Sequence, residues 1–170
     1  VSAPVQVRIA NGSAPNGLGA SRRAKLVARF QGRGKRAGRR QVTVRFGRTR
    51  PIRGRLTVAS GKPIADARID VMAKNMRLGA KTRREGVVET GADGRFRYVP
   101  TRGPSRRLQF RYHAFTLDPE PSATAEARLS VRAGVRLDVR PRRTTSRGTI
   151  RFAGRLAGGP GRDGIQVAAS

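Results

Sequence analysis

The chain has 170 residues, of which 36% are hydrophobic and 5% aromatic, so it has room for one domain, or two small ones, with a thin core. It contains no cysteine, which excludes disulfides, thiolate zinc sites and cysteine nucleophiles. The formal net charge is +28, from 38 Lys and Arg against 10 Asp and Glu, and the 21 glycines and 10 prolines favour many tight turns between short strands.

Residues 1–41 are predicted to be a hairpin-like tail of a preceding unit, followed by a basic linker. Alternating patterns over residues 5–9 and 25–30 predict two strands that pair across the Gly- and Asn-rich segment between them. Residues 20–30 also fit a helix capped by Ser21, but the alternation of apolar residues within them favours the strand.

Residues 42–133 are predicted to form one β-sandwich module. Strands with one apolar and one charged face are typical of antiparallel sheets packed on one side, and two such sheets make a sandwich of about 100 residues. We therefore expect an all-β, antiparallel, seven-stranded sandwich, with a hairpin turn at Asp93-Gly94. The expected strands cover residues 42–46, 52–58, 67–72, 87–90, 95–98, 107–112 and 125–132. The aromatic residues expected on the core face are Phe30, Phe46, Phe96, Tyr98, Phe110 and Tyr112.

Residues 134–170 are predicted to be the first strands of a second, truncated module of the same kind. Gly54-Arg55-Leu56 recurs as Gly154-Arg155-Leu156, an offset of 100 residues. Upstream of these tripeptides, residues 135–139 match residues 42–46. A period close to 100 residues is that of one sandwich.

Turn and strand residues follow a recognisable order between residues 50 and 112: Gly61, Pro63, Ile64, Ala67, Ile69 and Val71, then Thr90, Asp93, Gly94 and Phe96, then Pro100, Gly103, Leu108 and Phe110. This order resembles the carboxypeptidase regulatory-like domain, a transthyretin-like, Ig-like β-sandwich found in repeat-containing secreted and surface proteins, including Arg-rich actinobacterial ones. The resemblance implies a non-catalytic accessory module. Asp66 departs from it, because the family commonly has glycine there.

The sequence predicts no enzyme, no metal site and no cofactor. His113 is the only histidine and has no partner at ligand spacing. Asp66 and Asp70 are four residues apart, as are Glu85 and Glu89. On a strand this spacing puts the carboxylates of each pair on one face about 13 Å apart, beyond the ~5–9.5 Å of glycosidase pairs. We expect these carboxylates to neutralise neighbouring arginines.

Two basic clusters are the candidate polyanion-binding sites. They comprise Arg33, Lys35, Arg36, Arg39 and Arg40 in the first and Arg140, Arg142, Arg143 and Arg147 in the second. Two explanations of the positive charge stay open. One is a polyanion partner, and the other is a GC-rich genome, whose codons enrich Arg, Ala, Gly and Pro together.

We therefore expect a non-catalytic structural or adhesive module of a secreted or cell-surface multidomain protein. The alternative is a protein that binds nucleic acid or an anionic polysaccharide through Arg-rich loops. The expected partners are neighbouring domains, an anionic cell-wall polymer or polysaccharide, and nucleic acid bound without sequence specificity. The apolar runs are too short for membrane insertion. No signal peptide is present and the sequence starts at Val1, so we expect a processed product or a fragment located outside the cell.

Overall fold

A computed structural model of the chain describes residues 14–32, 38–140, 148 and 151–157. The regular elements of these residues are all strands, and no helix long and apolar enough to cross a membrane occurs among them. The strands are β1 (Ala24–Phe30), β2 (Gln41–Arg45), β3 (Ile52–Val58), β4 (Arg68–Asn75), β5 (Thr82–Glu89), β6 (Arg95–Tyr98), β7 (Arg106–Tyr112), β8 (Ala123–Arg132), β9 (Gly134–Arg140) and β10 (Arg151–Ala157).

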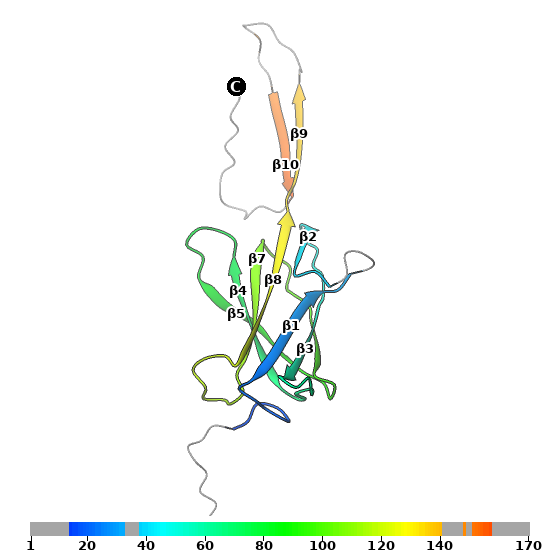
Figure 1. The fold of residues 1–170 in the computed structure, drawn as a ribbon. Coiled ribbons are helices and arrows are strands. Elements are labelled where there is room, and N and C mark those ends of the chain that lie inside the picture. Colours follow the sequence, from blue (N-terminus) through cyan, green and yellow to red (C-terminus); the bar gives the residue numbers. More distant parts are fainter. Residues whose placement is uncertain (1–13, 33–37, 141–147, 149–150, 158–170) are drawn as a thin grey trace, which may run out of the picture.

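Eight of these strands form two sheets that enclose the core (Figure 1). One sheet has the order β1-β3-β6, and the other has the order β2-β8-β7-β4-β5. The all-β prediction is confirmed, but the sheets are not wholly antiparallel, because β2 runs parallel to β8. In the chain β2 follows β1 and precedes β3, and both of these strands belong to the smaller sheet. No hairpin turn joins β2 to β8, so no turn forces the two strands to be antiparallel.

The core is built from the inward residues of both sheets, as strand alternation predicts. Phe110 of the larger sheet contacts aromatic residues of the smaller sheet within this core. The ring centroids of Phe96 and Tyr98 lie 5.5 Å and 5.8 Å from the ring centroid of Phe110. Phe46 is an exception to the expected core aromatics. It directly follows the last residue of β2, at the turn marked by Gly47, and is 47% exposed.

The N-terminal boundary of the module differs from the prediction. The strand expected over residues 25–30 exists as β1, but its partner is β3 of the same sandwich, with Phe30 opposite Ile52. Its inward residues Leu26, Ala28 and Phe30 belong to the same core as the later strands. Residues 24–30 are therefore part of the sandwich and not of a preceding unit, and the strand expected over residues 5–9 lies outside the described residues.

Asn16 fastens the segment before β1 to the end of the larger sheet. Its side-chain amide donates to the carbonyls of Arg68 and His113, both at 2.8 Å, and its side-chain oxygen accepts from the Arg68 amide at 2.8 Å. The Tyr112 hydroxyl donates to the Asn16 carbonyl at 3.0 Å. These bonds satisfy backbone groups where β4 begins and β7 ends, so they close one end of the sandwich.

Thr90 ties together the two places where the chain crosses between the sheets. Its hydroxyl donates to the Ile64 carbonyl at 2.8 Å and accepts from the Ala67 amide at 2.9 Å. The Asp66 amide donates to the Thr90 carbonyl at 2.9 Å. Asp66 has a φ of 51°, a left-handed conformation that Gly accepts most readily and that Asp and Asn tolerate better than most other residues.

Asp93-Gly94 forms the predicted turn, but the hairpin prediction is wrong, since this turn joins β5 and β6, which lie in different sheets. Gly94 has a φ of 71°, and a Cβ there would overlap the Leu56 carbonyl. The Leu56 amide donates to the Gly94 carbonyl at 2.8 Å, so the turn packs against β3. Close backbone approach explains why glycine is needed at this position.

We predict that Phe30→Ala lowers the free energy of unfolding of the whole sandwich by about 3–5 kcal/mol, because the ring is 1% exposed within the shared core. Val27→Ala, on the outer side of the same strand, should cost about 1 kcal/mol or less. Urea denaturation followed by circular dichroism measures both. If Phe30→Ala left the main unfolding transition unchanged, β1 would not belong to this module.

Candidate functional site

Glu85 and Arg106 form a buried ion pair between β5 and the start of β7. Their side chains are 3% and 1% exposed, and two bonds of 2.8 Å and 2.9 Å join the guanidinium to the two carboxylate oxygens. The remaining donors of Arg106 reach the Pro104 carbonyl at 3.1 Å and the Thr101 carbonyl and hydroxyl. The Tyr98 hydroxyl donates to Glu85 at 3.2 Å, so the cluster is fully bonded.

A β-bulge turns Glu85 toward the interior. Val71 pairs with Gly86 and Met72 pairs with Arg84, so Glu85 is the extra residue of β5. The prediction that Glu85 and Glu89 share one face is therefore wrong, because Glu89 is exposed. The prediction that Glu85 neutralises an arginine is confirmed.

Sequence reasoning missed Arg106. Arg106 lies two residues before Leu108, and every second residue of a strand faces the same side. Alternation alone therefore places Arg106 on the inward face of β7, with Leu108, Phe110 and Tyr112. A cation on a core face requires a buried acidic partner, and this requirement is the signal that could have indicated a pair. The identity of that partner depended on the bulge, which the sequence pattern did not reveal.

The cluster shifts the pKa of both acidic groups beside Arg106. Burial raises the pKa of Glu85, but the hydrogen bonds and charge of Arg106, with bonds from Thr101, outweigh it and hold the pKa below its ordinary value. Burial, and then the neighbouring Glu85 carboxylate, raises the pKa of Tyr98 to about 12. Glu85 is thus ionised and Tyr98 neutral around pH 7, a combination that suits structural bonding and leaves neither group ready to exchange a proton.

Two further carboxylates, Asp70 and Asp118, also neutralise arginines. Asp70 lies 2.8 Å from Arg84, as the sequence analysis expected. Asp118 holds Arg22 by two bonds of 2.8 Å and 3.2 Å, and this hydrogen-bonded contact lowers the pKa of Asp118. The His113 ring bonds the backbone carbonyl of Asp118 and not its carboxylate, so the two side chains do not form a proton relay.

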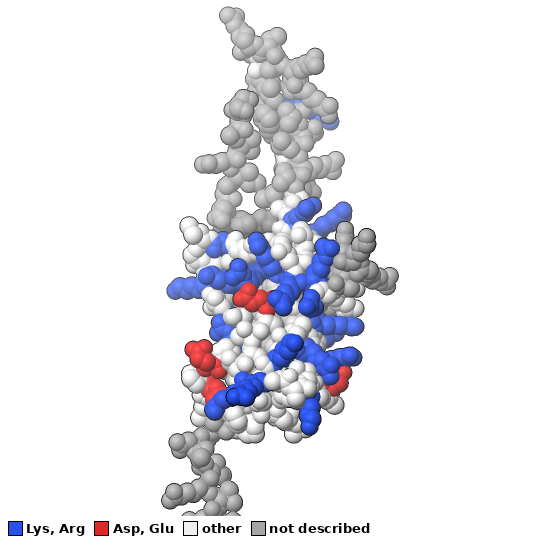
Figure 2. Space-filling model, viewed as in Figure 1, with Lys and Arg blue, Asp and Glu red and all other residues white. Residues whose placement is uncertain are grey.

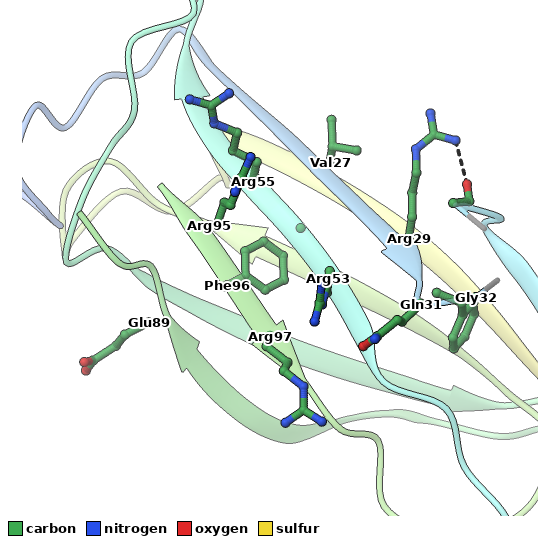
Figure 3. Close-up of a pocket in the computed structure, with 13 residues that line it drawn as sticks. Val27, Arg29, Gln31, Gly32, Arg53, Arg55, Glu89, Arg95, Phe96 and Arg97 are labelled. Carbon is green, nitrogen blue, oxygen red and sulfur yellow. Dashed lines mark hydrogen bonds between the residues drawn. The ribbon is translucent and has the colours of Figure 1, made fainter. Parts of the chain in front are cut away.

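The outward strand residues of the three-stranded sheet carry cations and no carboxylate, and the outer face of this sheet is here called the arginine face. Its outward residues are Lys25, Val27 and Arg29 of β1, Arg53, Arg55 and Thr57 of β3, and Arg95 and Arg97 of β6. An open groove crosses it, and Figure 3 shows its lining side chains. Glu89, from the edge of the other sheet, also lines the groove, and its carboxylate points away from the arginines in Figure 3.

Gly54 allows the sheet to sit directly on the core beneath the arginine face. It lies opposite Ala28 on β1 and Phe96 on β6. A Cβ at this position would overlap the Phe96 ring and the Val27 carbonyl. Any larger residue would therefore push β3 outward and disturb the spacing of the side chains on the face.

Most of the two predicted basic clusters lies outside the described residues, namely Arg33, Lys35, Arg36, Arg142, Arg143 and Arg147. Arg39, Arg40 and Arg140 are described, and all three are exposed. Gly32 and Gly38, the described residues on either side of residues 33–37, line the groove. Arg29 donates to the Gly38 carbonyl at 2.8 Å.

Within the described part of the chain, no three His, Cys, Asp or Glu residues gather into a possible metal site. The arginine face can present guanidinium groups to an anion.

We predict that Glu85→Gln lowers the free energy of unfolding by about 3 kcal/mol at neutral pH, because it leaves Arg106 buried without its counter-charge. The folded pKa of Glu85 is lowered, so its contribution is complete above the unfolded value, near 4.5, and is lost as the pH falls through the folded value. The stability difference between wild type and Glu85→Gln should therefore shrink at acid pH.

Urea denaturation at neutral and at acid pH measures this difference. Glu89→Gln is the matched control, since it removes an exposed carboxylate from the same strand and should change stability by less than about 0.5 kcal/mol. Equal effects of the two variants at neutral pH would contradict the role assigned to the buried pair.

Comparison with known proteins finds no matching family model, no similar curated protein and no similar solved structure.

Proposed function

We propose that this chain is a non-catalytic β-sandwich module of a secreted or cell-surface protein, acting as a structural spacer between neighbouring modules. The observation that carries the proposal is the strand register of β9 and β10. Leu156 pairs with Val135 and Gly154 with Leu137. In the sandwich, Leu56 pairs with Leu26 and Gly54 with Ala28.

The two antiparallel pairs thus have the same register around the repeated Gly-Arg-Leu tripeptide. By this register β9 corresponds to β1, whereas the sequence analysis matched residues 135–139 with residues 42–46. We infer that β9 and β10 are the counterparts of β1 and β3 and begin a second module. An isolated two-stranded hairpin is marginally stable in water, so such a pair needs further strands to pack against.

The junction between β8 and β9 also supports a spacer. Only Ala133 separates the two strands, and β9 continues away from the sandwich in Figure 1. So short a junction leaves little freedom between one module and the next. The left-handed φ of Asp66 supports the resemblance to the carboxypeptidase regulatory-like domain, because the family's usual glycine suits that conformation.

Polyanion binding is the second candidate function, favoured by the arginine face. The outward residues of β1, β3 and β6 include no Asp or Glu. Figure 2 shows how far cations outnumber carboxylates on the visible surface of the molecule. The two functions are compatible, since a spacer can also attach to an anionic polymer.

We predict that residues 1–133 joined directly to a second copy of residues 25–133 fold into two modules, the second less stable because it lacks the bonds of Asn16. This junction puts Lys25 in the place of Gly134, as the matched registers require. Calorimetry should show an unfolding enthalpy close to twice that of one module.

A second chain, residues 1–134 joined to residues 42–133, follows the match made from sequence alone and is the control. Its second copy lacks β1 and three core residues, so it should not fold cooperatively. Failure of the first chain to form a second folded unit, or equal behaviour of both chains, would refute the correspondence of β9 with β1.

A further inference from the structure

We propose that the arginine face binds an extended chain of phosphate groups through Arg29, Arg53 and Arg97, here called the arginine row, with Arg55 and Arg95 beside it. This inference rests on the second candidate function, polyanion binding. It places the binding site on the outer face of the three-stranded sheet, whereas the sequence analysis placed it in the two basic clusters.

The register of the sheet aligns the row. Arg29 lies directly opposite Arg53, and Arg53 lies directly opposite Arg97, so the three residues stand on adjacent strands about 4.8 Å apart. Arg55 and Arg95 form the next cross-strand pair, about 6.7 Å further along. All five side chains are exposed. The result is a two-dimensional grid of guanidinium groups held by a rigid backbone.

The charge of the row is not compensated. Among the described residues no carboxylate forms an ion pair with Arg29, Arg53 or Arg97, and the nearest acidic contact on the face is an exposed one of 3.5 Å between Arg95 and Asp93. Like charges directly opposite each other on neighbouring strands destabilise a sheet. An anionic ligand would reduce that repulsion, so electrostatic interactions favour the binding of an anion to this face.

The opposite side of the sandwich carries an equivalent cross-strand row of cations, Lys74, Arg107 and Arg128, so such a row alone does not distinguish the arginine face. The difference is in the carboxylates, because Asp70 and Glu126 lie among the cations on the outer face of the five-stranded sheet. A bias in codon usage would enrich arginine on both faces without removing carboxylates from only one. The segregation of the carboxylates therefore favours a binding role for the arginine face.

The chemistry of the face selects phosphate and disfavours a base-reading role. The planar fork of arginine matches phosphate oxygens with two parallel hydrogen bonds. Single-strand nucleic-acid sites add exposed aromatic residues on which bases stack. The two aromatic residues that line the groove, Phe30 and Phe96, are 1% and 5% exposed, so neither ring is presented for stacking on a base. The expected ligand is thus a flexible phosphate polymer recognised through its backbone charges.

The test measures binding of the full chain to inorganic polyphosphate by fluorescence anisotropy over a range of salt concentrations. Changing the whole row, Arg29→Ser, Arg53→Ser and Arg97→Ser, should weaken binding on the order of tenfold and reduce the slope of log K against log salt by about 2. Urea denaturation should show that this variant folds, because the substitutions are exposed and relieve repulsion.

The matched control is Lys74→Ser, Arg107→Ser and Arg128→Ser. These residues form an equivalent cross-strand row of three exposed cations on the other sheet, so the control removes the same net charge. It should weaken binding less than about threefold. Equal losses in the two variants would overturn the site while leaving polyanion binding in place. No binding of wild type at low salt would overturn both.

Two further arms test the ligand class. Oligothymidylate of equal charge should bind more weakly than polyphosphate. If oligothymidylate bound more tightly, and its binding depended on the arginine row, the choice of a phosphate polymer over nucleic acid would be overturned.

The triple variant Arg29→Lys, Arg53→Lys and Arg97→Lys keeps the charge but loses the planar fork, so its affinity for polyphosphate should fall several-fold. Full affinity in that variant would overturn guanidinium–phosphate recognition.

Discussion

Repulsion among 38 basic side chains is the constraint under which this sandwich forms. A thin apolar core must hold the sheets together while many outward positions carry a cation. The chain meets this constraint in two ways. Strand alternation sends the cations of the described strands outward, where water screens them, and Arg106, the one buried cation among the described residues, is matched by a carboxylate at 2.8 Å. The bulge in β5 exists at the residue that supplies this carboxylate.

The same constraint distinguishes the two surfaces of the molecule. On the larger sheet Asp70 forms an ion pair with Arg84, so the surface charge is partly balanced. On the smaller sheet the ion pair found among the described residues is the exposed contact of Arg95 with Asp93, and the repulsion within the row of Arg29, Arg53 and Arg97 is left uncompensated. A rigid sheet makes this surface more selective than a basic loop, because the spacing of the charges is defined by the strand register and not by chain flexibility.

Strand alternation predicted most of the fold, since a one-sided sheet must bury every second residue. It identified β1, β3 and β7 and their inward residues, including Phe30 and Phe110. It placed Glu85 on the wrong face, because a bulge breaks the period of two and leaves no trace in the sequence pattern. It detached β1 from the module, because pairing between distant strands depends on three-dimensional packing and not on local sequence.

The arginine face escaped sequence reasoning for a related reason. Dense clusters such as residues 33–40 are visible in one dimension, whereas Arg29, Arg53 and Arg97 are separated by more than twenty residues. Only the pairing of β1, β3 and β6 brings them into one row. The individual arginines were seen as solvated outer residues of their strands, and that description is correct for each one taken alone.

The path of β8 has a mechanical consequence. The segment held by Asn16 and the start of β9 lie at opposite ends of the sandwich in Figure 1, and β8 runs between β2 and β7 toward the β9 end. A pull on the chain from both sides would load β8 along its own axis. Its hydrogen bonds to both neighbours would then be sheared together and would have to fail in concert, whereas a hairpin pulled open at its end loses its bonds one at a time. Such a strand arrangement resists stretching, which is a useful property for a module under tension at a surface.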